Sequence, residues 1–194
     1  MDAVPLKLIV GLGNPGDEHE RQRHNAGFDF VDLLAARHGG TFRFESRHMA
    51  DLARVRIGGS DVWLLKPMSY MNRSGSPVAS VAGFYRIGPA EILVAHDELD
   101  FAPGDVRLRQ GGGHGGHNGV RDILANLDES FWRLRLGIGH PGDRNKVSDY
   151  VLSRPSKADE ELIGVAVAAA ADAVPMMMQQ GAQQAIRVLH GRPR

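Results

Sequence analysis

The sequence predicts an α/β fold, a single domain with a twisted mixed β-sheet flanked by helices. Two observations predict it: strand patterns alternate with helix patterns along the 194 residues, and no repeat or linker composition divides them. A chain of this length suffices for one domain with its own core. We therefore expect one domain over residues 1–194.

The first half of the chain is expected to form a strand, a helix and a hairpin. Residues 6–10 are apolar and precede a glycine-rich turn, which predicts a short buried strand. The pattern that follows indicates a helix from about 25 to 37, where two glycines stop it. Strand patterns at 52–57 and 62–65 flank a Gly-Gly-Ser turn and predict the hairpin.

The middle of the chain adds a helix and the strand that carries the candidate acids. Pro77 suits the first turn of a helix, with Phe84 and Tyr85 on its apolar side. The apolar run 92–95 predicts a strand with the sequence His-Asp-Glu of residues 96–98 at its carboxyl end. Sites in open α/β sheets commonly lie at such ends.

A further strand is expected over 132–138, where apolar residues alternate with Arg133 and Arg135. Because successive side chains of a strand point to opposite faces, we expect one buried face and two exposed arginines.

The chain is expected to end in two helices. An alanine-rich helix should run from about 157 to 173 behind a capping box, and Pro175 should break or kink it. Methionines 176–178 are interpreted as core filler or a lid surface. A short helix over 182–189 completes the expected fold.

Composition restricts the class of protein. The 23 basic and 23 acidic residues balance, so any attraction to nucleic acid must come from local clustering. The absence of cysteine excludes disulfides, a thiol nucleophile and cysteine-ligated zinc. We find no stretch resembling a membrane span or a signal peptide, and we expect a cytoplasmic protein with no membrane partner.

The stretch from Gly111 to Gly119 reads Gly-Gly-Gly-His-Gly-Gly-His-Asn-Gly and is the most informative feature of the chain. Glycine permits close approach of a ligand to the backbone but costs chain entropy on folding. An amphipathic helix pattern follows, so we expect Asn118 or Gly119 to cap its start. The alternative, a flexible loop without function, is less consistent with two histidines and an asparagine.

Three enzyme classes match poorly. The run Gly11-Leu-Gly-Asn-Pro-Gly16 has the glycine spacing of a dinucleotide site, but Pro15 and a polar run delay the helix that such a site requires. His19 and His24 are five residues apart, whereas a zincin helix needs a spacing of four. No Gly-x-Ser-x-Gly elbow of a serine hydrolase occurs.

A metal site remains an open alternative. His114 and His117, with His140 and Asp97, could form a hydrolytic zinc site, although glycine loops hold ligands poorly.

A metal-free set of one imidazole, one carboxylate and several carboxamides is the other reading. Its members are His24, Asp97, Asn14, Asn72 and Asn118. A carboxylate bonded to one imidazole nitrogen leaves the other nitrogen as a base able to deprotonate water. Carboxamides can hold a peptide-like group and can donate to a developing oxyanion. Each asparagine alone could equally be a turn or helix cap.

These residues fall within motifs that resemble the bacterial peptidyl-tRNA hydrolase family over essentially the whole chain. The matching words are Val10-Gly-Leu-Gly-Asn-Pro-Gly16, Arg23-His-Asn-Ala-Gly27, Lys66-Pro-Met-Ser-Tyr-Met-Asn72 with Ser74-Gly75, His96-Asp-Glu-Leu-Asp100, Gly111 to Gly119, and Arg135-Leu-Gly-Ile-Gly-His-Pro-Gly142. The resemblance implies hydrolysis of the ester that joins a peptide, or an N-blocked amino acid, to the 3′ end of tRNA. It implies no cofactor, no metal and a monomer.

The resemblance also implies roles for individual residues. His24 would be the general base, Asp97 its orienting partner, and Asn14 would hold the peptide or the catalytic water. The candidate substrate-binding residues are Asn72, Met71, Tyr70, His117 and Asn118.

Contacts with tRNA are expected from a separate group of residues. Arg109 and Arg135 match positions that clamp the terminal phosphate, and Arg144 and Lys146 would help; ordinary surface charge is the alternative. The chain departs from the family pattern at His19, where a tyrosine is usual, and at Gln22, where a threonine is common. His19 is kept among the candidate tRNA contacts.

A rival interpretation from another class is an RNA-binding module on the same fold that has lost catalysis, as in plastid splicing relatives. The presence of both His24 and Asp97 favours the enzyme.

Overall fold

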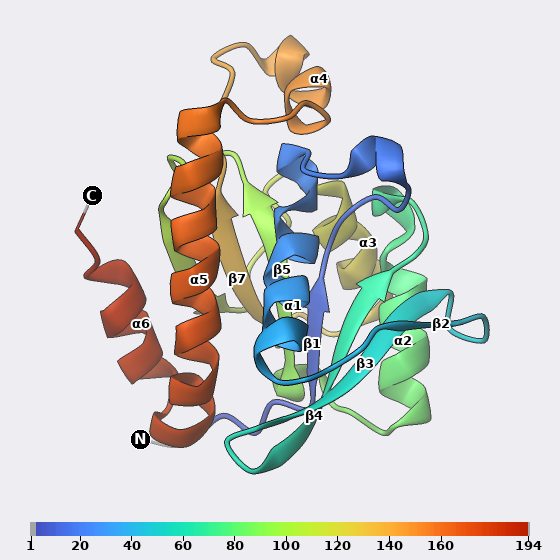
Figure 1. The fold of residues 1–194 in the computed structure, drawn as a ribbon. Helices are drawn as coiled ribbons and strands as arrows, with labels where there is room; N and C mark the ends of the chain where they lie inside the picture. The colour runs from blue at the N-terminus through green and yellow to red at the C-terminus, as the bar shows by residue number, and fades with distance from the viewer. Residues whose placement is uncertain (1–2, 194) are drawn as a thin grey trace.

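The computed structural model describes residues 3–193, which form a seven-stranded sheet in the order β2-β3-β4-β1-β5-β7-β6 (Figure 1). Strands β4, β1, β5 and β7 are parallel to their neighbours within this group, whereas β2, β3 and β6 join it antiparallel. The strands are β1 Leu8–Gly11, β2 Arg43–Glu45, β3 Ala50–Ile57, β4 Ser60–Pro67, β5 Ile92–Glu98, β6 Val106–Gln110 and β7 Trp132–Gly137. The mixed sheet confirms the predicted fold class.

Helices cover both faces of the sheet (Figure 1). They are α1 Ala26–Arg37, α2 Gly75–Phe84, α3 Asn118–Asn126, α4 Val147–Val151, α5 Lys157–Gln180 and α6 Ala182–His190. Alternate side chains of β1 enter two separate cores: Ile9 packs with α1, α5 and α6, whereas Leu8 and Val10 pack with α2 and α3. Burial on both faces explains why β1 reads as a continuous apolar run.

The predicted hairpin is confirmed as β3 and β4, with longer arms than expected. The edge strands β2 and β6 and the short helix α4 were not predicted, because each has only three to five residues. The expected apolar side of α2 is partly wrong: Phe84 is 54% exposed, and the ring of Tyr85 stacks on Trp63 at the surface.

The expectation that Arg133 is exposed is wrong, because this side chain is 2% exposed. β7 is an inner strand, and its arginine face is not open to solvent at this position. Arg133 donates from Nε to Nε2 of His96 at 3.2 Å and from Nη1 to the carbonyl oxygen of Gly113. Arg135, two residues later, is half-buried.

Pro175 was expected to break or kink the long helix; the break is wrong, since α5 continues through Pro175 to Gln180. Burial explains the continuation: Val174 lies in the core before Pro175, and Met177 and Met178 lie in it afterwards. The core-filler interpretation of these methionines is thereby confirmed for Met177 and Met178.

Helix α5 also corrects the expectation about membrane spans. Over 18 residues its mean hydropathy is 1.6, so its length and composition alone would allow it to cross a bilayer. Half of that window is buried inside the molecule, and the helix packs against α1 and the sheet (Figure 1). Its apolar character is accounted for as that of a core helix.

The parallel strands direct the candidate residues to one edge of the sheet. Asn14 follows β1, Tyr70 follows β4, and Asp97 lies near the carboxyl end of β5. The start of α1 packs directly on β1 and β5, because Gly27 has no side chain; a Cβ there would collide with the carbonyl oxygen of Ala95. This contact brings the turn that carries His24 next to Asp97.

Candidate active site

A cleft of about 460 Å³ opens where the parallel strands end. It is lined by every residue predicted for catalysis or substrate binding, namely His24, Asp97, Asn14, Asn72, Met71, Tyr70, His117 and Asn118. A more apolar part of the lining comes from Leu99 and from α4 with its flanks, where Val147, Val151 and Leu152 line the cleft.

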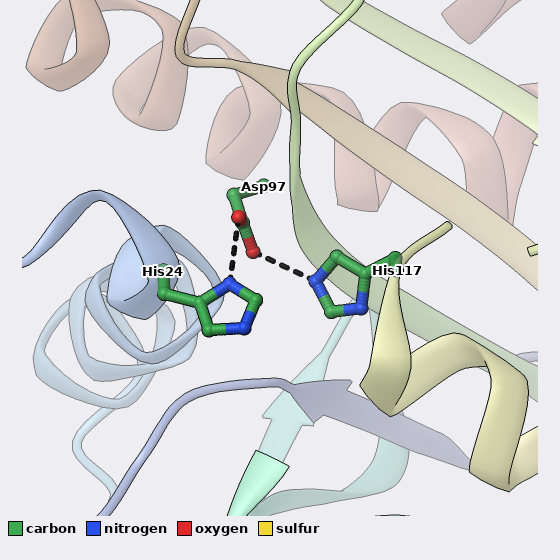
Figure 2. Close-up of side chains that lie close together, drawn as sticks. All are labelled: His24, Asp97 and His117. Atoms are coloured by element: carbon green, nitrogen blue, oxygen red, sulfur yellow. Dashed lines mark hydrogen bonds and ion pairs between the residues drawn. The ribbon is translucent and has the colours of Figure 1, made fainter. Parts of the chain in front are cut away.

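Asp97 lies between the imidazoles of His24 and His117 (Figure 2). These three residues and Asn14 line the cleft, and we call them its floor. Its Oδ2 is 2.8 Å from Nδ1 of His24, and its Oδ1 is 2.8 Å from Nε2 of His117. The Asp97 side chain is only 2% exposed. Each side chain comes from a different element: His24 precedes α1, Asp97 belongs to β5, and His117 immediately precedes α3.

His117 caps α3, which corrects the expectation that Asn118 or Gly119 does so. Its Nδ1 accepts hydrogen bonds from the backbone N–H groups of Gly119 at 3.1 Å and Val120 at 3.3 Å. Since Nδ1 accepts, Nε2 must carry the proton that it donates to Asp97. His117 lines the cleft as expected, but both ring nitrogens bind groups of the protein.

His24 has the opposite tautomer. Asp97 is an acceptor, so Nδ1 of His24 donates to it and Nε2 retains the free lone pair in the neutral ring. Burial lowers the pKa of His24, but the charge of Asp97 and the hydrogen bond with it outweigh that effect and raise the pKa above its usual 6.5. Burial alone would raise the pKa of Asp97, yet the two imidazoles hold it well below its usual range. The pair can therefore supply a base with an ionised partner.

Hydrogen bonds to Met71 and Asn25 hold Asn14 in place and leave its side-chain Nδ2 group without a partner within residues 3–193. Its Oδ1 accepts from the backbone N–H of Met71 at 2.7 Å. The side chain of Asn25 bonds to both backbone groups of Asn14. Its Oδ1 accepts from the Asn14 N–H at 2.8 Å, and its Nδ2 donates to the Asn14 carbonyl oxygen at 3.0 Å. The Nδ2 group of Asn14 is thus a preoriented donor at the cleft.

Asn25 was not among the carboxamides expected from the sequence, which were Asn14, Asn72 and Asn118. The available signal was its place in the word Arg23-His-Asn-Ala-Gly27, directly after His24.

The remaining cleft residues lie at its rim. Tyr70 is 65% exposed, and Asn72 and Asn118 are also exposed. Oδ1 of Asn118 accepts from Arg121 at 3.3 Å. Met71, between Tyr70 and Asn72, is buried and forms part of the wall.

The candidate phosphate contacts lie outside the cleft, on β6 and β7. Arg107 is opposite Arg135, and Arg109 is opposite Arg133, so four arginines share one face of this strand pair. Like charges directly across a strand pair repel, and an anion between them would relieve the repulsion. Arg107 was not among the predicted contacts. The alternation of arginine with apolar residues in 106–110 could have indicated it.

The other candidate tRNA residues are scattered. Arg144 lines the cleft, whereas Lys146 is exposed on the same short turn and does not line it. His19 lies in the turn Asp17–His19, outside the cleft lining. Its Nδ1 is 2.9 Å from Oε1 of Gln22, so the two residues that depart from the family pattern bind each other.

The zinc site considered from the sequence is not assembled. Among residues 3–193, the group of potential ligands near one another is His24, Asp97 and His117, with ligand atoms within 4.8 Å. His114 and His140 are not members; each accepts from a backbone N–H of its own loop. A metal bound between these three groups would replace the hydrogen bonds that Asp97 makes with the two imidazoles.

Comparison with known proteins identifies the family. The family model described as peptidyl-tRNA hydrolase matches residues 8–194. Peptidyl-tRNA hydrolase of Neisseria meningitidis is 50% identical over 96% of this chain and 98% of the relative, and that of Shewanella halifaxensis is 51% identical over 95% and 96%. The crystal structure of peptidyl-tRNA hydrolase from Acinetobacter baumannii superposes with a TM-score of 0.94 at 46% identity, covering 98% of this chain and 97% of that one. The chain belongs to the peptidyl-tRNA hydrolase family.

Proposed function

We propose that this protein hydrolyses the ester between a peptide, or an N-blocked amino acid, and the 3′ end of tRNA, with His24 as a metal-independent general base. Family membership supports the substrate class. The single observation that carries the mechanism is the 2.8 Å bond between Nδ1 of His24 and Asp97, which leaves Nε2 as the basic nitrogen of a side chain that lines the cleft.

In the proposed reaction, Nε2 of His24 takes a proton from water while the water oxygen attacks the ester carbonyl carbon. The tetrahedral intermediate then breaks its bond to the ribose oxygen. That oxygen takes the proton back from His24, which releases free tRNA and the peptide as its carboxylic acid. Asp97 stays ionised throughout and stabilises the imidazolium, a role worth about 10² to 10⁴ in rate together with the base.

The asparagines would orient the substrate around this base. Asn14 can donate from Nδ2 to the attacking water or to the developing oxyanion, because its Oδ1 is already bonded to Met71. Asn72 and Asn118, with Tyr70, are suited to the peptide backbone, since a carboxamide offers both a donor and an acceptor. Met71 would form the wall beside them.

We propose that the arginine face of β6 and β7 binds tRNA phosphate, with Arg109 and Arg135 as the clamp. The position of Arg135 supports this assignment: it lies opposite Arg107 on this strand pair, and the carboxylate of Glu98 is only 3.8 Å from its Nη1. Arginine suits bidentate contact with phosphate. Arg144 and Lys146 would assist from the turn Arg144–Lys146, of which Arg144 lines the cleft. The position of His19 does not directly support its assignment as a tRNA contact.

A monomer working in the cytoplasm with no cofactor and no membrane partner completes the proposal. Full activity after exhaustive chelation is the expected result for the metal-independent mechanism, and loss of activity that added zinc restores would favour a metal enzyme.

The test of function uses the purified full chain with N-acetyl-aminoacyl-tRNA and with the unblocked aminoacyl-tRNA. We expect selective cleavage of the blocked ester. Binding of tRNA without cleavage of either substrate would instead support the RNA-binding module.

A further inference from the structure

A third histidine, next to Asp97 in the sequence, contacts this site and has no part in the proposed reaction. His96 precedes Asp97 on β5 and is 1% exposed. Its Nδ1 is 2.8 Å from the backbone carbonyl oxygen of Asp97, which can only accept. Its Nε2 is 3.2 Å from Nε of Arg133, which can only donate. Its tautomer is therefore fixed, with the proton on Nδ1 and the lone pair on Nε2.

Arg133 extends this chain of bonds to the glycine loop. Its Nη1 donates to the carbonyl oxygen of Gly113, which lies in the same loop as His117. The guanidinium is buried, and that burial lowers the pKa of Arg133 to about 10, so it remains charged at neutral pH. Burial, followed by the nearby His117 and Arg133, keeps the pKa of His96 well below 6.5.

His96 also contacts the second imidazole of the site. The rings of His96 and His117 pack edge to face with centroids 4.9 Å apart. His96 thus contacts Asp97 through its backbone and His117 through its ring, and it is connected to the loop through Arg133.

We propose that His96 and Arg133 are positioning residues, which hold the Asp97 carboxylate in register with His24 and fix the glycine loop to the floor of the cleft. The two ring nitrogens of His96 have different functions in this proposal. Nδ1 positions Asp97 through its backbone carbonyl, and Nε2 positions the glycine loop through Arg133. The catalytic consequence rests on the proposed function above, whereas the geometric consequence does not.

Two substitutions of His96 distinguish the contact at Nδ1 from the contact at Nε2. In His96→Asn the amide lies near the position of Nδ1 and can still donate to the Asp97 carbonyl, but nothing accepts from Arg133. In His96→Gln the amide oxygen reaches the position of Nε2 and can accept from Arg133, but the donor to the Asp97 carbonyl is lost.

The two variants should fail differently. With His96→Gln, a loosened Asp97 attracts His24 less, so we expect the pKa of His24 to fall and kcat to drop about ten-fold, with little change in KM. With His96→Asn, we expect kcat and the His24 pKa near the parent values but KM raised several-fold, because the loop is released. Arg133→Lys should resemble His96→Asn, since a lysine lacks the fork that makes both contacts.

The pKa of His24 is best read from its imidazole nitrogens by NMR titration, because this measurement needs no substrate. If the parent cleaves no ester while the His24 pKa still moves in His96→Gln, the proposed function fails and the positioning role stands. If the pKa and the split between kcat and KM match the parent in both His96 variants, the positioning role is overturned.

His48 provides a matched control. It is also buried, at 6% exposed, and it bonds through Nδ1 to Ser80 at 2.6 Å, but it lies outside this network. We expect His48→Gln to lower the melting temperature and leave the His24 pKa and the kinetics unchanged.

One measurement on the parent protein keeps the proposal testable if the His96 variants do not fold. The nitrogen spectrum should show the Nδ1–H tautomer for His96 and for His24, and the Nε2–H tautomer for His117. An Nε2–H tautomer at His96 would be incompatible with the bond from Arg133 and would overturn the proposal.

Discussion

The floor and the rim of the cleft are built differently. On the floor, Asn14, His24, Asp97 and His117 are held by hydrogen bonds to other parts of the protein. On the rim, Tyr70, Asn72 and Asn118 are exposed, and the only bond that holds any of their side chains within residues 3–193 is the 3.3 Å contact between Asn118 and Arg121. Preorganised groups serve a chemical step, whereas exposed side chains with few hydrogen bonds suit a substrate whose peptide varies. Substitutions on the floor should therefore affect kcat, and those on the rim should affect KM.

Among the variants that test this contrast between floor and rim, we expect the largest effect from Asp97→Asn. The asparagine amide can donate to His24, which would place the His24 proton on Nε2 and remove the base; we expect kcat to fall by about 10³. Loss of the negative charge also lowers the His24 pKa, so the acid limb of the kcat/KM profile should move to lower pH. A pH–rate profile and single-turnover rates check both effects. An unshifted limb with parental kcat would argue against the pair.

Asn25→Ala tests the floor at a residue that does not face the substrate. The variant loses both bonds to Asn14, which we expect to lower stability by about 1–3 kcal/mol and kcat by about ten-fold. Denaturant unfolding and steady-state kinetics measure the two effects. Asn72→Ala is the rim counterpart, with KM raised and stability unchanged. Equal effects of both variants on kcat would remove the contrast.

Much of the floor could be predicted from the sequence, because His24, Asp97 and Asn14 lie in recognisable sequence motifs. The hydrogen bond between His117 and Asp97 could not be predicted, because the two residues are 20 positions apart in the sequence. The same holds for Arg133, which is buried on an inner strand and bonds to His96, 37 positions earlier. The passage of α5 through Pro175 was missed because burial of the flanking residues overrode a local propensity.

Arg135→Ala addresses a surface outside both floor and rim. We expect weaker tRNA binding and a log–log salt slope smaller by up to about 0.7 for one lost single-strand phosphate contact. The variant should keep kcat at saturating substrate. Binding isotherms at several salt concentrations give the slope, and Arg37→Ala, a surface arginine paired with Asp172, serves as the control. If Arg135→Ala binds tRNA with the same salt slope as the parent, the proposed phosphate clamp is refuted.

The smallest effect is expected at Tyr70, a rim residue that is 65% exposed and whose side chain has no hydrogen bond within residues 3–193. Tyr70→Ala should change stability by less than about 0.5 kcal/mol and raise KM only a few-fold. A large fall in kcat in this variant would mean that the rim also organises the chemistry.

The central claim is that Nε2 of His24 activates the attacking water. It is tested most directly by the single-turnover cleavage rate of N-acetyl-aminoacyl-tRNA in His24→Ala, with tRNA binding measured in parallel. The account predicts a fall of about 10² to 10⁴ in the rate with binding largely retained. Cleavage at the parental rate would contradict it.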